Sequence, residues 1–89
     1  MITFIFGKEA VKEFLDLERV SRERISNKLK VLKNHPDIFS ILVKLEGLGL
    51  ATHRLRIGNI RLILKLEKQG REYIEFFILR LGHRREIYR

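Results

Sequence analysis

The spacing of apolar residues changes twice along the chain. Near the start, apolar and polar positions alternate loosely up to a glycine, which predicts a strand over Ile2–Phe6. The apolar residues then recur three and four positions apart, which is the period of amphipathic helices. We expect one helix over residues 8–17. A second helix is expected to begin with Ser21 as its N-cap and to carry apolar side chains at Ile25, Leu29 and Leu32.

The helical period ends near Pro36. Residues 37–52 are rich in apolar side chains without a regular spacing, so we expect a packed connection with a helical turn there. Strands are expected after it over His53–Ile57, Ile60–Glu67 and Tyr73–Leu81. The pattern therefore predicts an α+β fold in one domain of residues 1–89, with two N-terminal helices packed on a small, mainly antiparallel four-stranded sheet.

The dipeptide Gly58-Asn59 predicts a two-residue hairpin loop, and such a loop determines the register of the flanking strands. Arg56 then lies opposite Arg61, and one face of the hairpin is apolar. The other face carries Arg54, Arg56, Arg61, Ile63 and Lys65. Like charges directly across a ladder cost stability, which indicates a surface that binds phosphate. The alternative is that these cations cover the sheet with their stems and pair with Glu67, Glu72 or Glu75.

Composition narrows the function classes. Residues 1–52 hold 9 basic and 7 acidic groups (+2) and residues 53–89 hold 10 and 4 (+6), which together give the net charge of +8. This asymmetry suits RNA, DNA or an acidic protein as partner, and the alternative is that the surface charge serves solubility alone. The chain has no cysteine, and its three histidines are scattered, so we expect neither a disulfide nor a metal site. No apolar run approaches the ~20 residues that span a bilayer, so we expect a cytoplasmic protein. With 89 residues, an enclosed site for a small-molecule cofactor is not expected.

The last eight residues are Gly82-His83-Arg84-Arg85-Glu86-Ile87-Tyr88-Arg89, which place a histidine, an arginine pair and a tyrosine directly after an apolar strand. This tail resembles the C-terminal signature of RelE-type toxins of the RelE/ParE superfamily, and residues 54–62 resemble the central hairpin of that family. The match runs through most of the chain in element order. The resemblance implies a toxin of a type II toxin-antitoxin system that cleaves mRNA in the decoding site of the ribosome, without a metal, and arrests translation.

The resemblance also implies roles for single residues. Arg61 and Arg84 would stabilise the phosphate, and Tyr88 would activate the nucleophile or stack on a base. The best-known enterobacterial RelE has two lysines where this chain has Arg54 and Arg56, and arginine transfers protons poorly. Histidine titrates near neutrality, so His83 is either the substitute general base or a polar residue that ends the strand. RNA would be bound by Arg54, Arg56, Lys65 and Arg85.

Two other functions stay open at this point. ParE-type members of the superfamily share the fold but inhibit DNA gyrase, and they generally lack the catalytic arginine and the terminal tyrosine. The third possibility is an inactive toxin-like module that binds RNA. As partners, the resemblance implies a cognate antitoxin, with an acidic amphipathic helix as the expected binding element, together with the ribosome and mRNA.

Overall fold

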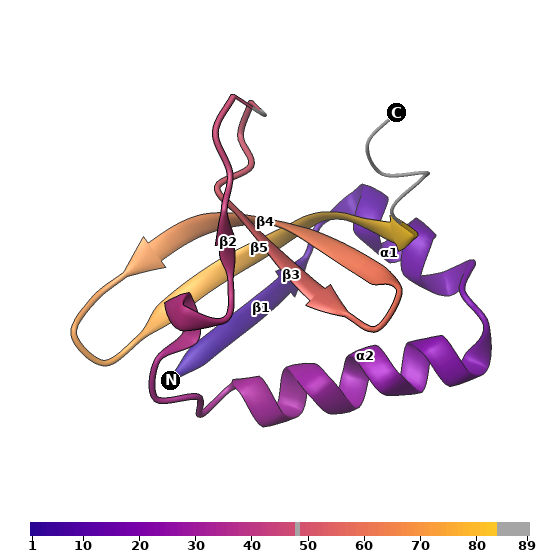
Figure 1. Ribbon diagram of the computed structural model, residues 1–89, viewed down its shortest axis with the longest axis horizontal. Helices are drawn as coiled ribbons and strands as arrows, with labels where there is room; N and C mark the ends of the chain where they lie inside the picture. The colour runs from indigo at the N-terminus through magenta and orange to yellow at the C-terminus, as the bar shows by residue number, and fades with distance from the viewer. Residues whose placement is uncertain (48, 84–89) are drawn as a thin grey trace.

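Within residues 1–47 and 49–83, five strands form one mixed sheet in the order β1-β5-β4-β3-β2, and two helices pack on it (Figure 1). The computed structural model describes residues 1–47 and 49–83. The elements in chain order are β1 (Ile2–Phe6), α1 (Lys8–Leu15), α2 (Arg19–Leu32), the 3-10 turn η1 (Ile38–Ser40), β2 (Val43–Lys44), β3 (His53–Ile57), β4 (Ile60–Gln69) and β5 (Ile74–His83). β1 runs parallel to β5, and the other neighbouring strands are antiparallel.

The α+β class and the two packed helices are confirmed, but the prediction of four strands was wrong. The fifth strand is β2, in which Val43 and Lys44 pair with Arg54 and His53. A strand of two residues is too short to show a period of two in the sequence. The helical turn expected within residues 37–52 is present as η1.

The helices begin and end differently from expectation. α2 starts at Arg19, so Ser21 lies inside the helix and is not its N-cap. The side chains of Ile25, Leu29 and Leu32 are buried, as the spacing predicts. In α1 the buried residue is Ala10, whose small side chain lets the helix approach the sheet closely.

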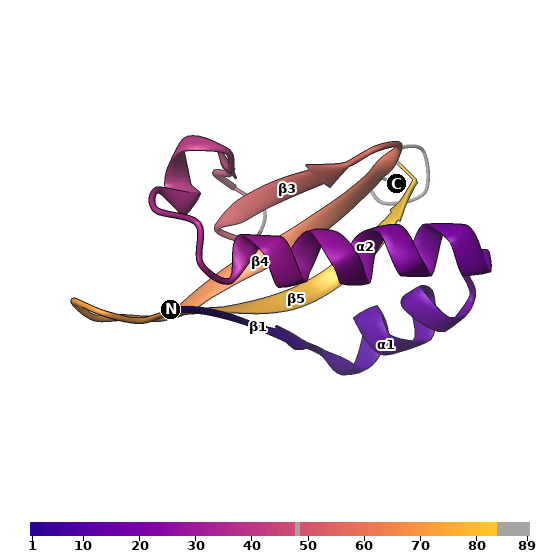
Figure 2. The ribbon, with the colours of Figure 1, turned by 90° about the horizontal axis from the view of Figure 1, so that it is seen from below.

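The main core lies between the helices and the face of the sheet that we call the inner face. Its strand residues alternate with outward-facing ones, and the buried set includes Leu55, Ile57, Ile60, Leu62, Leu64, Phe76, Ile78 and Leu81. In the view of Figure 2, α2 runs across the strands, with α1 beside it. The opposite face of the sheet, which the helices leave uncovered, is called the outer face below.

α1 lies along the part of β5 that β1 does not reach. The β1–β5 ladder ends where Phe6 pairs with Ile78. Beyond that point, Glu13 of α1 accepts hydrogen bonds from the Leu81 backbone N–H at 3.1 Å and from Arg80 Nε and Nη2 at 3.0 and 2.9 Å. The hydrogen bonds from Arg80 to Glu13, and then the charge of Glu13, raise the pKa of Arg80. Arg80 is therefore held at the edge of the sheet by an ion pair.

His53 is a half-buried histidine that makes the stability of the fold depend on pH. Its ring lies 5.3 Å from that of Phe39 and 5.9 Å from that of Phe76, between ring centroids. Its Nδ1 is 2.9 Å from Thr52 Oγ1. Burial, and then the positive charge of Lys44, lower the pKa of His53. The folded protein thus favours the neutral imidazole.

We expect the free energy of unfolding to fall as the pH drops below about 6.5, the ordinary pKa of histidine. The unfolded chain binds the proton first, since the folded-state pKa is the lower one, so this stabilisation is complete above the unfolded value. The stabilisation is lost as the pH falls through the folded-state pKa of His53. Urea unfolding between about pH 5 and pH 8 measures the effect. The His53→Gln variant should lose this part of the pH dependence, whereas His83→Gln, which changes an exposed histidine, should keep it.

Candidate active site on the outer face of the sheet

The β3–β4 hairpin has the predicted register. Ile57 pairs with Ile60, and Arg56 pairs with Arg61. Gly58 has a φ of 60°, which L side chains rarely adopt and glycine adopts without strain. A two-residue loop with positive φ at Gly58 but not at Asn59 matches a type II′ turn. The turn therefore brings the cations of the hairpin onto the outer face together.

These cations differ in how far they reach into solvent. Arg56 is exposed, Arg54 and Lys65 are half-buried, and Arg61 is only 9% exposed. The sequence predicted an exposed cationic surface, so the burial of Arg61 is a departure from it. A guanidinium group with little surrounding water interacts more strongly with an anion than one in bulk solvent. Among the four cations, Arg61 thus has the surroundings that best suit stabilisation of a charged phosphate.

Lys65 and Arg56 each bond to a neighbouring group of the hairpin. Lys65 Nζ lies 3.0 Å from Glu67 Oε2, so the alternative of pairing with a glutamate holds for Lys65. Arg56 Nε donates a hydrogen bond to the carbonyl oxygen of Gly58 at 3.1 Å. That bond places Arg56 at the turn of the hairpin.

His83 lies on the inner face, away from the arginines. It pairs with Ile60, whereas Gly82 pairs with Arg61. The reason is an irregularity in the β4–β5 ladder between Ile63 and Leu64, which reverses the alternation along β5. The sequence analysis grouped His83 with Arg61 as a candidate catalytic residue, and only an alternation without this irregularity would have placed His83 on the outer face. The structure brings Arg54, Arg56, Arg61 and Lys65 together and leaves His83 on the other side.

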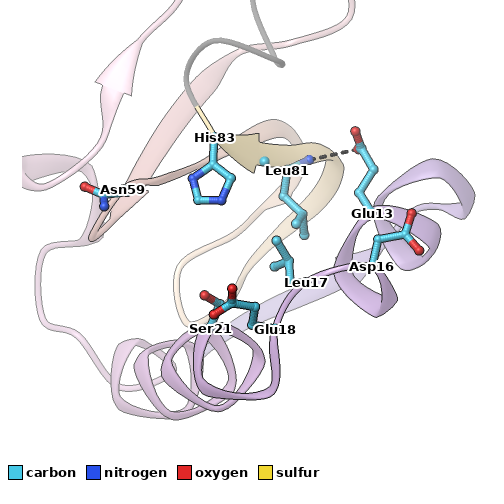
Figure 3. Close-up of a pocket in the computed structure, with 9 residues that line it drawn as sticks. Glu13, Asp16, Leu17, Glu18, Ser21, Asn59, Leu81 and His83 are labelled. Atoms are coloured by element: carbon cyan, nitrogen blue, oxygen red, sulfur yellow. Dashed lines mark hydrogen bonds between the residues drawn. The ribbon is translucent and has the colours of Figure 1, made fainter.

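The surroundings of His83 are acidic. It lines a cavity of about 660 Å³ at the corner between α1, α2 and the hairpin turn (Figure 3). Three carboxylates line the same cavity, those of Glu13, Asp16 and Glu18. Such surroundings do not suit a phosphate group, because like charges repel.

Three of the predicted site residues, Arg84, Arg85 and Tyr88, lie outside the described residues. Within residues 1–47 and 49–83, no group of histidine, aspartate and glutamate side chains could hold a metal ion. In the same part of the chain, no helix is long and apolar enough to cross a membrane.

No family model and no curated protein matches this chain, but solved structures do. The RelBE2 toxin-antitoxin complex from Mycobacterium tuberculosis contains a chain that superposes with a TM-score of 0.72 at 20% identity, over 92% of this chain and 96% of that one. The RelB-RelE complex from Methanococcus jannaschii contains a chain that superposes with a TM-score of 0.66 at 26% identity, over 94% of each chain. A chain of the intact RelBE complex of E. coli superposes with a TM-score of 0.63 at 25% identity, over 91% of this chain and 94% of that one. The chain has the RelE toxin fold.

The resemblance that the hairpin and the tail carried is thereby confirmed. The likeness covers more than nine-tenths of this chain in each of these comparisons, so it includes both the helices and the sheet. In this RelE-type fold the outer face includes a further residue that sequence reasoning did not single out. Phe77 of β5 pairs with Lys65 of β4. Its signal in the sequence was its place next to Phe76 in a strand that is apolar on both faces.

Proposed function

We propose that this protein is the toxin of a type II toxin-antitoxin system and acts as a metal-independent endoribonuclease that cuts mRNA on the ribosome and so arrests translation. The observation that carries the proposal is the pairing of Arg56 with Arg61 on the outer face of a RelE-type sheet. A like-charge pair across a ladder costs stability, and a bound polyanion would neutralise both positive charges. The net charge of +8 supports the same partner.

Cleavage of RNA without a metal needs activation of the ribose 2′-hydroxyl, stabilisation of charge on the phosphate and protonation of the leaving oxygen. Arg61 and Arg84 are proposed to stabilise the phosphate, and Tyr88 and His83 are the candidates for proton transfer. The place of His83 on the inner face favours Tyr88 for that role. The RNA backbone is proposed to contact Arg54, Arg56, Lys65 and Arg85, which grip phosphate as charged donors.

A cognate antitoxin is proposed as the protein partner, with the ribosome and mRNA as targets in the cytoplasm. Support comes from the solved structures of similar fold from Mycobacterium tuberculosis, Methanococcus jannaschii and E. coli, which are toxin-antitoxin complexes. A basic toxin suits an acidic amphipathic helix as the segment that neutralises it.

A cell-free translation extract tests the function. Addition of the protein should create new mRNA 5′ ends when ribosomes are engaged on the message, and none when initiation is blocked. A plasmid supercoiling assay with DNA gyrase runs in parallel. A change in supercoiling without new mRNA ends would support the ParE-like alternative, and no effect in either assay would support an inactive RNA-binding module.

Binding to RNA should weaken steeply with salt. Each phosphate neutralised on a single strand contributes a slope of about −0.7 in log affinity against log salt. The four proposed backbone contacts then predict a loss of about 50-fold between about 50 and 200 mM salt. Fluorescence anisotropy with a labelled single-stranded RNA measures the slope, and Arg56→Gln should reduce it by about 0.7. An affinity that hardly changes with salt would contradict the proposed phosphate contacts.

A further inference from the structure

An aromatic ring lies beside the cations of the outer face. Phe77 pairs with Lys65 on one side and with Ile5 of β1 on the other. The preceding residue, Phe76, is fully buried and belongs to the core cluster. Side chains alternate along a strand, so Phe77 points to the outer face. It is half-buried and does not belong to the core cluster or to the residues packed against it.

Phe77 and Ile5 form an apolar row on a side of the sheet where solvent would favour polar residues. Ile5 is 38% exposed beside Phe77, although the solvent side of a sheet ordinarily carries polar side chains. The helices do not cover the row, because both pack on the inner face. Phe77 and Ile5 thus form an apolar shelf beside Lys65, the cross-strand partner of Phe77 on β4.

We propose that the ring of Phe77 is a stacking platform for a base of single-stranded RNA bound across the outer face. This inference rests on the proposed function, since it takes RNA as the occupant of that face. A base stacks on an aromatic side chain of an open sheet while cations hold the backbone, and the described part of the face supplies both groups. Charge complementarity selects RNA as the occupant. The row of the sheet next to Lys65 and Phe77 holds Arg54, and the row after that holds Arg56 and Arg61.

The position of Phe77 assigns it a role in placing the RNA. Lys65, its cross-strand partner, is four residues from Arg61 along β4, or about 13 Å at about 3.3 Å per residue. The ring is therefore too far from Arg61 to touch the scissile phosphate that Arg61 is proposed to stabilise. Phe77 is a positioning residue that determines which nucleotide reaches the arginines. Its loss should raise KM for ribosome-engaged mRNA more than it lowers kcat.

The test compares two substitutions that separate stacking from packing. Phe77→Leu keeps an apolar side chain without an aromatic face, and Phe77→Tyr keeps the ring. Binding of a labelled single-stranded RNA oligonucleotide is measured by fluorescence anisotropy at low salt. We expect about tenfold weaker binding for Phe77→Leu and binding within about twofold of the original protein for Phe77→Tyr. Leu15→Ala, which changes an exposed apolar residue of α1, is the control and should leave binding unchanged.

Equal affinities of all variants would overturn the proposal, and so would equal losses in Phe77→Leu and Phe77→Tyr, which would indicate packing. An original protein that binds no single-stranded RNA, or a Phe77→Leu variant that loses affinity for a protein partner alone, would overturn it as well. The cleavage assay separates this inference from the proposed function. Weaker RNA binding by Phe77→Leu in a protein that cuts no mRNA would uphold the platform and reject the nuclease. Normal RNA binding by Phe77→Leu in a protein that cuts would reject the platform alone.

Discussion

Replacement of Arg61 by alanine should lower the rate of ribosome-dependent mRNA cleavage by about a hundredfold to a thousandfold, the usual cost of losing one donor that stabilises transition-state charge. The physical reason is its position. Arg61 lies on the outer face opposite Arg56, and only 9% of it is exposed, so water competes little with its interaction with a phosphate. Affinity for the ribosome should change far less, because the other cations of the face remain.

Two further variants make the Arg61 result specific. Arg61→Lys keeps the charge but lacks the planar fork of donors, so we expect an intermediate rate. Arg19→Ala removes an exposed arginine of α2 that pairs with Glu23 at 3.0 Å, and it should cut normally. Thermal unfolding is recorded for each variant, because Arg61 is buried. Loss of folding in Arg61→Ala would assign a structural role to Arg61, and cleavage at the normal rate would show that the role implied by the RelE resemblance does not apply.

Replacement of Phe76 by alanine should lower the free energy of unfolding by about 3–5 kcal/mol. Phe76 is fully buried in β5, which lies between β1 and β4. Its ring centroid lies 5.8 Å from that of Phe4 and 5.9 Å from that of Phe39. The whole stability expected of a chain of this length is about 4–13 kcal/mol, at about 0.05–0.15 kcal/mol per residue. The variant should therefore be largely unfolded at moderate concentrations of urea.

Phe77→Ala is the matched control, because it removes the same side chain from the next residue of the same strand. Phe77 is half-buried on the outer face, so its loss leaves no closed cavity and should cost less than half as much. Urea unfolding of both variants gives the comparison. Similar losses for the two variants would mean that the assignment of Phe76 to the inner face and Phe77 to the outer face is wrong.

The sequence alone determined the features that depend on neighbours along the chain. The register of Arg56 with Arg61 was predictable because Gly58-Asn59 is a short turn, and its geometry sets the pairing of the adjacent strands. The buried side of α2 was predictable because Ile25 and Leu29 are four residues apart, which places them on one side of any α-helix. Both results come from local backbone geometry, so no knowledge of distant residues was needed.

The tertiary structure decided the features that depend on residues distant in the chain. β2 exists as a strand because β3 offers two residues an edge to pair with. The hydrogen bonds of Glu13 to Arg80 and Leu81 join residues 67 and 68 positions apart. The irregularity in the β4–β5 ladder places His83 on the inner face, and the burial of Arg61 is likewise a result of folding. A repeating pattern in the sequence describes an unbroken element, whereas a bulge or a buried cation depends on how the elements pack.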